Sequence, residues 1–333
     1  MAPLESLIQT LQQHNAKQVV VLTDSIVNTL YPHYLDSLAE HFATDKVVVP
    51  AGEASKSIEQ AIGIWQRLLR KSYGQDLFLV NFGGGMVCDL GGFVAATYKR
   101  GIHCINYPTT LLAMTDAAIG GKNAVNMGGV KNCIGTIRQP DYVVPADTHL
   151  LKTLPPKELQ SGFGEMIKYA LTSSSALFNE FEKLEKISAT AIRPEWIETC
   201  AAIKREIVAI DPMDSQQRHV LNFGHTFGHA LESLWHAEGK QMPHGVAVAI
   251  GTVYESSISM AQGLLKKEED ARIRQLVTRH YQIPPLTVQQ LAQIKSYMKQ
   301  DKKNRQAGIN FTLLRHIGEA VTDCIIPETD LFV

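Results

Sequence analysis

Short β-branched runs alternate with amphipathic segments in the first half of the chain. Residues 17–24 (KQVVVLTD), 45–50 (DKVVVP) and 76–82 (DLFLVNF) are mostly apolar, as strands are. Segments with helical periodicity lie between them, at about 26–43 and 56–72. This alternation predicts a parallel sheet covered by helices, and the nearly continuous apolar strands predict burial on both faces of that sheet.

The pattern changes after about residue 150. Helical periodicity then predominates, beginning at LPPKELQSGFGEMIKYA, where Pro155 and Pro156 suit a first helical turn. Further helices are predicted at about 192–210, 218–236, 244–263, 266–280 and 286–299, and two short strands in GINFTLLRHIG and AVTDCIIP. We therefore expect an α/β domain over residues 1–147 and an all-α domain with a short two-stranded addition over residues 148–333.

The composition narrows the classes of function. The 333-residue chain has a net charge of −1, so it has no overall positive field to attract nucleic acid or an acidic membrane. Its five cysteines form no CxxC pair, which favours reduced and mostly buried thiols. The N-terminus lacks a basic start followed by an apolar run, and no apolar stretch reaches membrane-spanning length. We expect a soluble, cytoplasmic protein.

Two glycine-rich segments are candidates for binding phosphate groups. Three glycines at 83–85 follow the third strand and precede a predicted helix, where backbone N–H groups can approach a phosphate closely. The motif is not GxGxxG, so a tight structural turn is an equal alternative. The second segment, 107–135, holds Lys122, Lys131 and Asn132 among small and apolar neighbours, where an unpaired charge would be costly. The alternative there is a surface loop with solvated lysines.

Polar side chains recur on one face of the helix predicted at 218–236. Arg218, Asn222, His225 and His229 are spaced i, i+4, i+7 and i+11, so they share one stripe of a continuous helix. Two imidazoles four residues apart can hold a divalent metal. An HExxH metalloprotease is excluded, because Thr226 stands where that motif requires glutamate.

Other segments supply further candidate ligands. His244 opens the next predicted helix, and Glu165 lies in an otherwise apolar helix with Lys168 three residues on, on the same face. A carboxylate and two imidazoles make a three-ligand site with an open position, the arrangement of catalytic zinc. Spacing alone does not decide which two of the three histidines bind, and a structural role for the pair in 222–229 is an equal alternative.

Longer motifs follow one another along the chain. They are GGGMVCDLGGFVAATYKRG, YPTTLLAMTDAAIGGK, GGVKNCIG, LPPKELQSGFGEMIKY and RHVLNFGHTFGHALE…HGVAVAIG. In this order they resemble the 3-dehydroquinate synthase family of sugar-phosphate cyclases, from about residue 18 to the terminal QDKKNRQAGINF. The resemblance implies a Rossmann-like NAD-binding α/β domain, a helical domain that holds zinc or cobalt, and a homodimer. It also implies a phosphorus–oxygen lyase of the shikimate pathway, which converts 3-deoxy-D-arabino-heptulosonate 7-phosphate to 3-dehydroquinate.

The resemblance also implies roles for individual residues. The metal ligands would be Glu165, His225 and His244, with His229 as the acid/base residue. The NAD contacts would be Asp24, Glu53, Lys56, Gly83, Gly84, Gly85, Asp89, Thr109, Thr110, Lys131 and Thr153. The substrate contacts would be Asp116, Lys122, Asn132, Lys168, Lys204, Arg218, Asn222 and either Lys302 or Lys303, with Arg100 reaching the neighbouring subunit's site.

The chain departs from the family pattern at one proposed functional position. The family usually has DExE upstream of the arginine, whereas this chain has DPMD, so Asp214 stands where a glutamate proton acceptor is expected. Aspartate is shorter by one methylene group. The variants HGVAVAIG for HGEAVAIG and GGKNAV for GGKTAV remove no proposed ligand.

Three rival functions remain at this point. A related cyclase could act on another seven-carbon sugar phosphate or on glucose 6-phosphate, but Lys122, Asn132 and Arg218 would then lack a carboxylate to bind. A metal-dependent polyol dehydrogenase shares the two-domain plan and would accumulate NADH. An inactive NAD-binding protein is disfavoured by the complete set of candidate metal ligands.

Overall fold

The computed structural model describes residues 2–128, 130–300 and 308–331. The chain divides into two compact units, Met1–Leu154 and Pro155–Val333. The boundary expected after residue 147 lies at the start of the short 3-10 helix η5 (Thr148–Thr153). This helix stays with the first unit, where the hydroxyl groups of Thr153 and Tyr31 lie 2.6 Å apart in a hydrogen bond.

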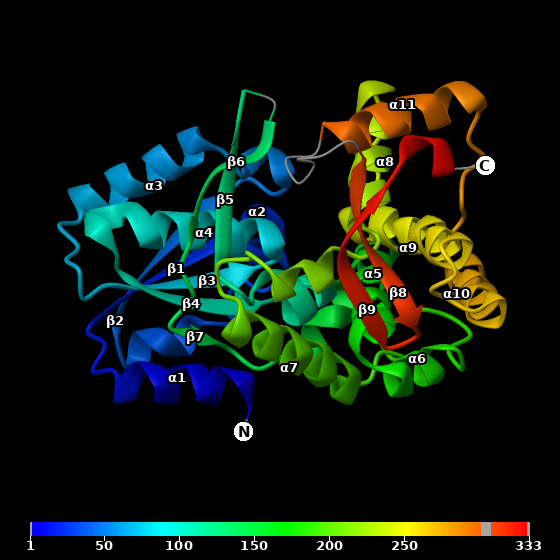
Figure 1. Cartoon of the computed structure of the whole chain (residues 1–333). Coiled ribbons are helices and arrows are strands. Elements are labelled where there is room, and N and C mark those ends of the chain that lie inside the picture. Colours follow the sequence, from blue (N-terminus) through cyan, green and yellow to red (C-terminus); the bar gives the residue numbers. More distant parts are fainter. Residues whose placement is uncertain (1, 129, 301–307, 332–333) are drawn as a thin grey trace. The chain divides into compact units, whose positions relative to one another are not determined.

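A five-stranded parallel sheet forms the centre of the first unit (Figure 1). Its strands, in spatial order, are β2 (Ala43–Val49), β1 (Gln18–Asp24), β3 (Phe78–Gly83), β4 (His103–Pro108) and β7 (Tyr142–Val143). The three strands predicted from the sequence are confirmed. Every residue of β3 is buried, and so is every residue of β1 after Gln18, as expected for strands covered on both faces.

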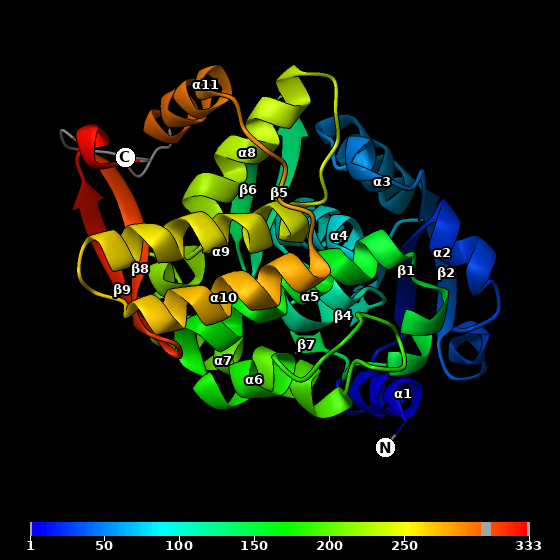
Figure 2. The same ribbon diagram turned by 90° about the vertical axis from the view of Figure 1, so that its right-hand side faces the viewer.

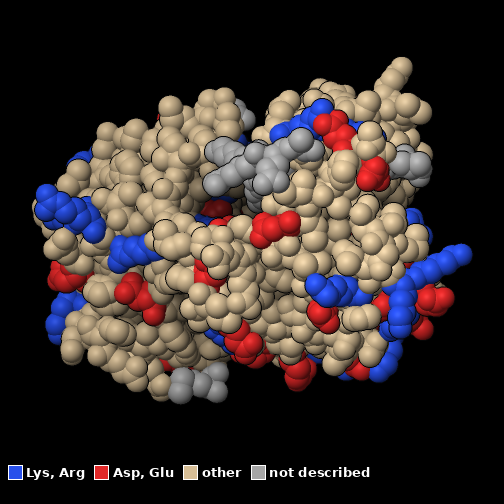
Figure 3. All heavy atoms as spheres, in the orientation of Figure 1, with Lys and Arg blue, Asp and Glu red and all other residues tan. Residues whose placement is uncertain are grey.

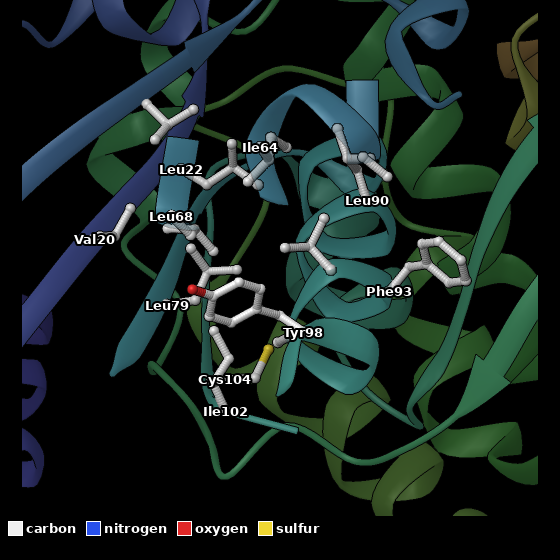
Figure 4. Close-up of a cluster of buried hydrophobic side chains, with 14 of the residues drawn as sticks. Val20, Leu22, Ile64, Leu68, Leu79, Leu90, Phe93, Tyr98, Ile102 and Cys104 are labelled. Carbon is white, nitrogen blue, oxygen red and sulfur yellow. The ribbon is translucent and has the colours of Figure 1, made fainter. Parts of the chain in front are cut away.

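Helices pack on the sheet of the first unit. They are α1 (Pro3–Gln13), α2 (Ser25–Leu30), α3 (Ile58–Arg70) and α4 (Gly85–Thr97), with 3-10 turns η1 (Asp36–Glu40), η2 (Glu53–Ser55) and η3 (Tyr98–Arg100). Figure 4 shows Leu22 of β1, Ile64 of α3 and Leu90 of α4 in one apolar cluster. The helix predicted over 26–43 is much shorter in the structure, where it corresponds to α2. It ends at Leu30, because the residue before Pro32 is disfavoured in helical geometry.

The segment 107–135 contains secondary structure that the sequence pattern did not predict. A short π-helix, η4 (Ala113–Ala117), is followed by an antiparallel hairpin of β5 (Lys122–Met127) and β6 (Val130–Ile137). Most of β6 is exposed, which explains why its pattern of polar and apolar residues carries no strand signal.

Over its described residues the second unit is helical, with one β-hairpin (Figure 2). Its helices are α5 (Pro156–Ser173), α6 (Ser175–Phe181), α7 (Pro194–Ile210), η6 (Gln217–Asn222), α8 (His225–Ala237), α9 (His244–Ala261), α10 (Lys267–His280), α11 (Val288–Lys299) and η7 (Glu328–Asp330). The hairpin is β8 (Ile309–His316) and β9 (Glu319–Ile326), as predicted. Phe227 of α8, Ile250 of α9 and Phe311 of β8 belong to one core cluster.

The distribution of charged side chains on the surface is mixed, as the net charge of −1 suggests. Acidic and basic side chains are both scattered over the face shown in Figure 3. Within the described residues, every helix is either too short or too polar to traverse a bilayer. All five cysteines are described and carry free thiols, three of them buried, as predicted.

Candidate functional site

Glycines bring three helices of the second unit into close contact. A methyl group at Gly164 of α5 would overlap the carbonyl oxygen of Gly245 of α9, and a methyl group at Gly251 of α9 would overlap that of Gly224 before α8. Each candidate ligand is the direct chain neighbour of one of these glycines. Glu165 follows Gly164, His225 follows Gly224, and His244 precedes Gly245. The close approach of the backbones therefore brings the three candidate ligands together.

The carboxylate of Glu165 lies at the centre of this group. Its Oε1 is 3.1 Å from Nε2 of His244 and 3.6 Å from Nε2 of His225. Ligand atoms of a tetrahedral zinc ion are about 3.3 Å apart, which follows from metal–ligand bonds of about 2.0–2.1 Å. Glu165 is 1% exposed, and its Oε2 is 2.7 Å from Nζ of Lys168. The donor set and its spacing fit a divalent metal.

His229 lies beside the same group. Its ring is 5.2 Å from the ring of His225 and 5.5 Å from that of His244, between centroids. One nitrogen from each of the three histidines lies within 4.8 Å of the others. His229 is the exposed member of the three, whereas the other two are half-buried. The structure thus brings together all four residues named from the sequence as metal or acid/base groups.

The two candidate ligand histidines, His225 and His244, have opposite pKa shifts. Burial lowers the pKa of His225, so this imidazole is neutral and can donate a lone pair to a metal. Burial would also lower the pKa of His244, but hydrogen bonds with the carboxylates of Glu165 and Glu232 outweigh it and raise the pKa to about 10. Metal binding at His244 would therefore release a proton.

The prediction of one continuous helix from residue 218 to residue 236 is wrong. The 3-10 helix η6 ends at Asn222, and α8 begins at His225 after Gly224, whose φ of 80° lies in the left-handed region. A buried carboxylate from α9 holds this start, since Glu255 accepts hydrogen bonds from the N–H groups of Gly224 (2.6 Å) and Phe227 (2.9 Å). Arg218 and Asn222 therefore do not share the α8 stripe with the histidines.

A loop before η6 positions Arg218. Asp211 accepts hydrogen bonds from the backbone N–H groups of Ser215, Gln216 and Arg218, which lower its pKa. The guanidinium of Arg218 donates to the carbonyl of Pro212 (3.1 Å), and the residue is 3% exposed. Asp214 lies in the same loop at φ 57°. Its carbonyl oxygen is 3.2 Å from Nε2 of His219.

Two further predicted cations are buried in the second unit. Lys168 of α5 and Lys204 of α7 are 2% and 6% exposed. Buried ammonium groups require charged or polar partners. Lys168 has such a partner in Glu165.

In the first unit, several predicted cofactor residues form a hydrogen-bonded network. Nζ of the buried Lys56 lies 2.9 Å from Asp89 Oδ2 and 3.3 Å from Glu53 Oε1. Burial lowers the pKa of Lys56, but these two carboxylates outweigh it and raise the pKa overall. Asn126 joins the network to the β5–β6 hairpin, because its side chain donates to Glu53 (2.9 Å) and accepts from the N–H of Asn132 (2.9 Å).

The glycine turn lies at the carboxyl edge of the sheet. The carbonyl oxygen of Gly83 accepts from the N–H of Thr109 (2.9 Å), and Gly84 faces the side chain of Thr110. The turn leads directly into α4, which has 13 residues, and the first N–H groups of a helix have no acceptor within it. Asp24, at the end of β1, accepts from the N–H groups of Ile26 and Val27 and so begins α2.

The remaining predicted residues of the first unit belong to several other elements. Asp116 is in η4, Lys122 opens β5, Lys131 is exposed on β6, and Thr153 ends η5. Arg100 is exposed in η3, which follows the end of α4, whereas the glycine turn precedes its start. Arg100 therefore lies beyond the end of α4 that is opposite to the glycine turn. Lys302 and Lys303 lie outside the described residues.

Sequence reasoning missed several residues that support the site. They are Asn126, Asp211, Glu232 and Glu255. Of these, Glu232 had a signal, because it follows His225 by seven residues and continues the helical stripe. Glu255 had none, since a single carboxylate in an apolar helix does not indicate which distant N–H groups it meets.

Comparison with known proteins identifies the family. The family model for the N-terminal part of 3-dehydroquinate synthase matches residues 46–161, and the model for its C-terminal part matches residues 162–304. The chain belongs to the 3-dehydroquinate synthase family. This confirms the resemblance drawn from the sequence motifs.

Relatives and solved structures agree with membership of the 3-dehydroquinate synthase family. The chain is 39% identical over 311 residues to 3-dehydroquinate synthase of Dehalococcoides mccartyi, covering 91% of this chain and 85% of the relative. It is 35% identical over 319 residues to that of Legionella pneumophila, covering 94% and 85%. A crystal structure of 2-deoxy-scyllo-inosose synthase, complexed with carbaglucose-6-phosphate, NAD⁺ and Co²⁺, superposes with a TM-score of 0.86 at 24% identity, covering 99% of this chain and 93% of that one. This confirms the predicted fold class.

Proposed function

We propose that this chain is a 3-dehydroquinate synthase, a phosphorus–oxygen lyase that converts 3-deoxy-D-arabino-heptulosonate 7-phosphate to 3-dehydroquinate and phosphate. The observation that carries the proposal is the convergence of Glu165 with His225 and His244 in a chain of this family. The product belongs to the shikimate pathway, which leads to chorismate and the aromatic amino acids.

The metal would be held by Glu165, His225 and His244. When bound, a zinc or cobalt ion supplies Lewis acidity to adjacent substrate oxygens. In the protein, Nδ1 of His225 donates to the carbonyl oxygen of Phe223 (3.2 Å), which leaves Nε2 available as a ligand. His229 is exposed beside the ligands, so it is the member of the group that is suited to exchange a proton with substrate.

NAD would bind to the first unit. When bound, it supplies a hydride acceptor that later returns the hydride, so the reaction causes no net oxidation. The contacts we propose are Asp24, Glu53, Lys56, Gly83, Gly84, Gly85, Asp89, Thr109, Thr110, Lys131 and Thr153. Their support is the glycine turn at the start of α4, which suits a pyrophosphate, and the Lys56–Asp89–Glu53 network beside the hairpin.

The substrate carries a carboxylate and a phosphate monoester, so its site needs several cations. We propose that Lys122, Lys168, Lys204 and Arg218 supply them, together with Lys302 or Lys303 and with Arg100 from a neighbouring subunit. Asp116, Asn132 and Asn222 would complete the polar contacts. Arg218 can bind an anion through two parallel N–H groups, whereas a lysine acts as a point charge.

Side chains of the protein would orient the substrate and accept its protons. The ion pair of Lys168 with Glu165 fixes both side chains beside the proposed metal position, so the lysine would need no reorganisation to meet the substrate. Asp214 would accept a proton in place of the usual glutamate, across a reach shorter by one methylene group.

We also propose a homodimer in the cytoplasm. The dimer is supported by Arg100, which is exposed at φ 68° away from the glycine turn and matches an arginine that reaches a neighbouring site in the family. The location is supported by five free thiols, which suit a reducing compartment, and by the requirement for NAD.

Phosphate release tests the function. The purified chain should release phosphate from the seven-carbon acid phosphate. This release should stop when a strong chelator removes the metal, and it should resume when zinc or cobalt is restored. The chain should accumulate no NADH, whereas a polyol dehydrogenase would. Turnover of glucose 6-phosphate but not of the acid phosphate would show that the chain is a different cyclase.

A further inference from the structure

We propose that Glu232 is a positioning residue that fixes the ring of His244 in the orientation needed to bind the metal. The inference rests on the proposed function, because it concerns the metal site named there. Oε2 of Glu232 lies 2.9 Å from Nδ1 of His244. On the other side of the ring, Nε2 of His244 lies 3.1 Å from Oε1 of Glu165.

The contact with Glu232 determines which ring nitrogen is available. An ionised carboxylate only accepts hydrogen bonds, so Nδ1 of His244 must carry the proton that it shares with Glu232. In the neutral imidazole Nε2 then holds the lone pair, and this is the nitrogen that faces Glu165. A carboxylate behind a metal-bound histidine in this way also raises the basicity of the ligand nitrogen.

Helix α8 places Glu232 where this contact is needed. Glu232 follows His225 by seven residues and His229 by three, so all three lie on one face of α8. The carboxylate of Glu255 holds the start of this helix, and the glycine contacts hold it close to α9. The Glu232 side chain is 15% exposed, which limits competition from water for the His244 proton.

His244 has particular need of such a partner. It is the first residue of α9, following Pro243, so no preceding helical turn restricts its side chain. The other ligand histidine is already fixed, because Nδ1 of His225 lies 3.2 Å from the carbonyl oxygen of Phe223. Each ligand ring therefore has its own acceptor for Nδ1, a main-chain carbonyl for His225 and Glu232 for His244.

The test measures metal affinity directly. Apo protein of the full chain is titrated with Co²⁺ in competition with a chromophoric chelator, and the visible absorption of bound Co²⁺ reports its ligand geometry. Removing a carboxylate behind a metal-bound histidine costs about 10–100-fold in metal affinity, so we expect that loss in Glu232→Ala. Glu232→Gln keeps an acceptor oxygen but loses the charge, and we expect a smaller loss.

Glu238→Ala is the matched control. Glu238 follows the last residue of α8, is exposed, and pairs with Lys240 at 2.7 Å. We expect Co²⁺ affinity and absorption in this variant to equal those of the wild type. A change in thermal stability alone, with unchanged affinity, is what a merely structural role of Glu232 would produce, and it would overturn the inference.

The outcomes separate this inference from the proposed function. If the wild type binds no Co²⁺ or Zn²⁺, the proposed metal site fails, and the role of Glu232 fails with it. If the wild type binds and both Glu232 variants bind within twofold of it with the same absorption, only the inference fails. Should Glu232→Ala not fold, Glu232→Gln decides, because its side chain has almost the same shape.

Discussion

Gly164 and Gly245 face each other where α5 crosses α9, with no room for a methyl group on either. A methyl group at Gly164 would overlap the carbonyl oxygen of Gly245, and one at Gly245 would overlap that of Ser161. Because main-chain atoms cannot turn aside as side chains do, the two helices would have to separate. Glu165 follows Gly164 and His244 precedes Gly245, so the crossing of the two helices directly sets the distance between two proposed metal ligands.

The first prediction concerns this crossing. Gly164→Ala should destabilise the protein by about 3 kcal/mol or more, since overpacking against rigid backbone is not relieved by a rotamer change. Metal affinity should fall as well. Urea unfolding measures the stability, and Co²⁺ titration measures the affinity.

Gly63→Ala is the control for Gly164→Ala. Gly63 also lies inside a helix, α3, and apart from its chain neighbours and the backbone of that helix no atom lies within 4 Å of a methyl group placed there. Alanine is favoured over glycine in a helix interior by about 0.5–1 kcal/mol, so this variant should be as stable as the wild type or more so. If Gly164→Ala also proved neutral, close packing at the crossing would not control the site.

A second prediction concerns the start of α8. Glu255 is fully buried and accepts hydrogen bonds from the N–H groups of Gly224 and Phe227. Glu255→Ala leaves these donors without that acceptor, and hydrogen bonds to a charged group contribute about 1.5–3 kcal/mol each. We expect a loss of about 3 kcal/mol in the free energy of unfolding, and a smaller loss for Glu255→Gln, which retains one acceptor. Equal stability of all three proteins in urea would contradict this account.

The same region shows where sequence reasoning reached its limit. Helical spacing from Arg218 to His229 fits one continuous stripe, yet the chain breaks at Gly224. A glycine beside a histidine can equally mark a close helix contact or a left-handed turn, and nothing local distinguishes them. The acceptor that stabilises the turn, Glu255, lies in the next helix, so the break depends on a tertiary contact.

Other parts of the site were predictable because local signals and family motifs agreed. His244 was expected to open a helix and does so, and Glu165 was expected on the same face as Lys168, which lies 2.7 Å away. The β5–β6 hairpin was missed, since exposed strands need no apolar alternation. Its contact with the network of Lys56, Asp89 and Glu53 depends on Asn126, one amide in a segment rich in polar residues.

A third prediction follows from the Glu165–Lys168 ion pair. Both groups are buried, so Lys168→Met removes the cation that pairs with Oε2 of Glu165. Breaking a buried pair in this way costs about 3–5 kcal/mol. A bound divalent cation would supply the missing positive charge, so the loss should be largest in the apo protein and smaller with zinc. Thermal unfolding of both proteins with and without zinc measures this, and an equal loss in both states would refute it.

A fourth prediction is a pH dependence centred on Asp211. Hydrogen bonds from the N–H groups of Ser215, Gln216 and Arg218 hold its pKa below the ordinary value of 3.8. The pKa of Asp211 is lower in the folded protein than in the unfolded protein. Its contribution to stability is therefore complete above the ordinary value of 3.8 and is lost as the pH falls from there toward the folded pKa. Asp211→Asn should therefore be less stable than the wild type by a constant amount from pH 8 to pH 5, and the difference should shrink below about pH 4. Urea midpoints across this range measure it, and a difference that varied between pH 5 and pH 8 would point to another group.

The last prediction separates the roles of His225 and His229, which share one face of α8. His225 is half-buried, and its Nε2 faces Glu165 at 3.6 Å, so His225→Ala removes a ligand and should lower metal affinity strongly. His229 is the exposed member of the histidine group, so His229→Ala should keep the metal and lose turnover, because a proton-transfer group contributes about 10²–10⁴-fold to the rate. Metal content after dialysis and phosphate release are measured on the same samples. If His229→Ala lost metal as readily as His225→Ala, His229 would be a ligand, since one of its nitrogens already lies within 4.8 Å of those of the other two histidines.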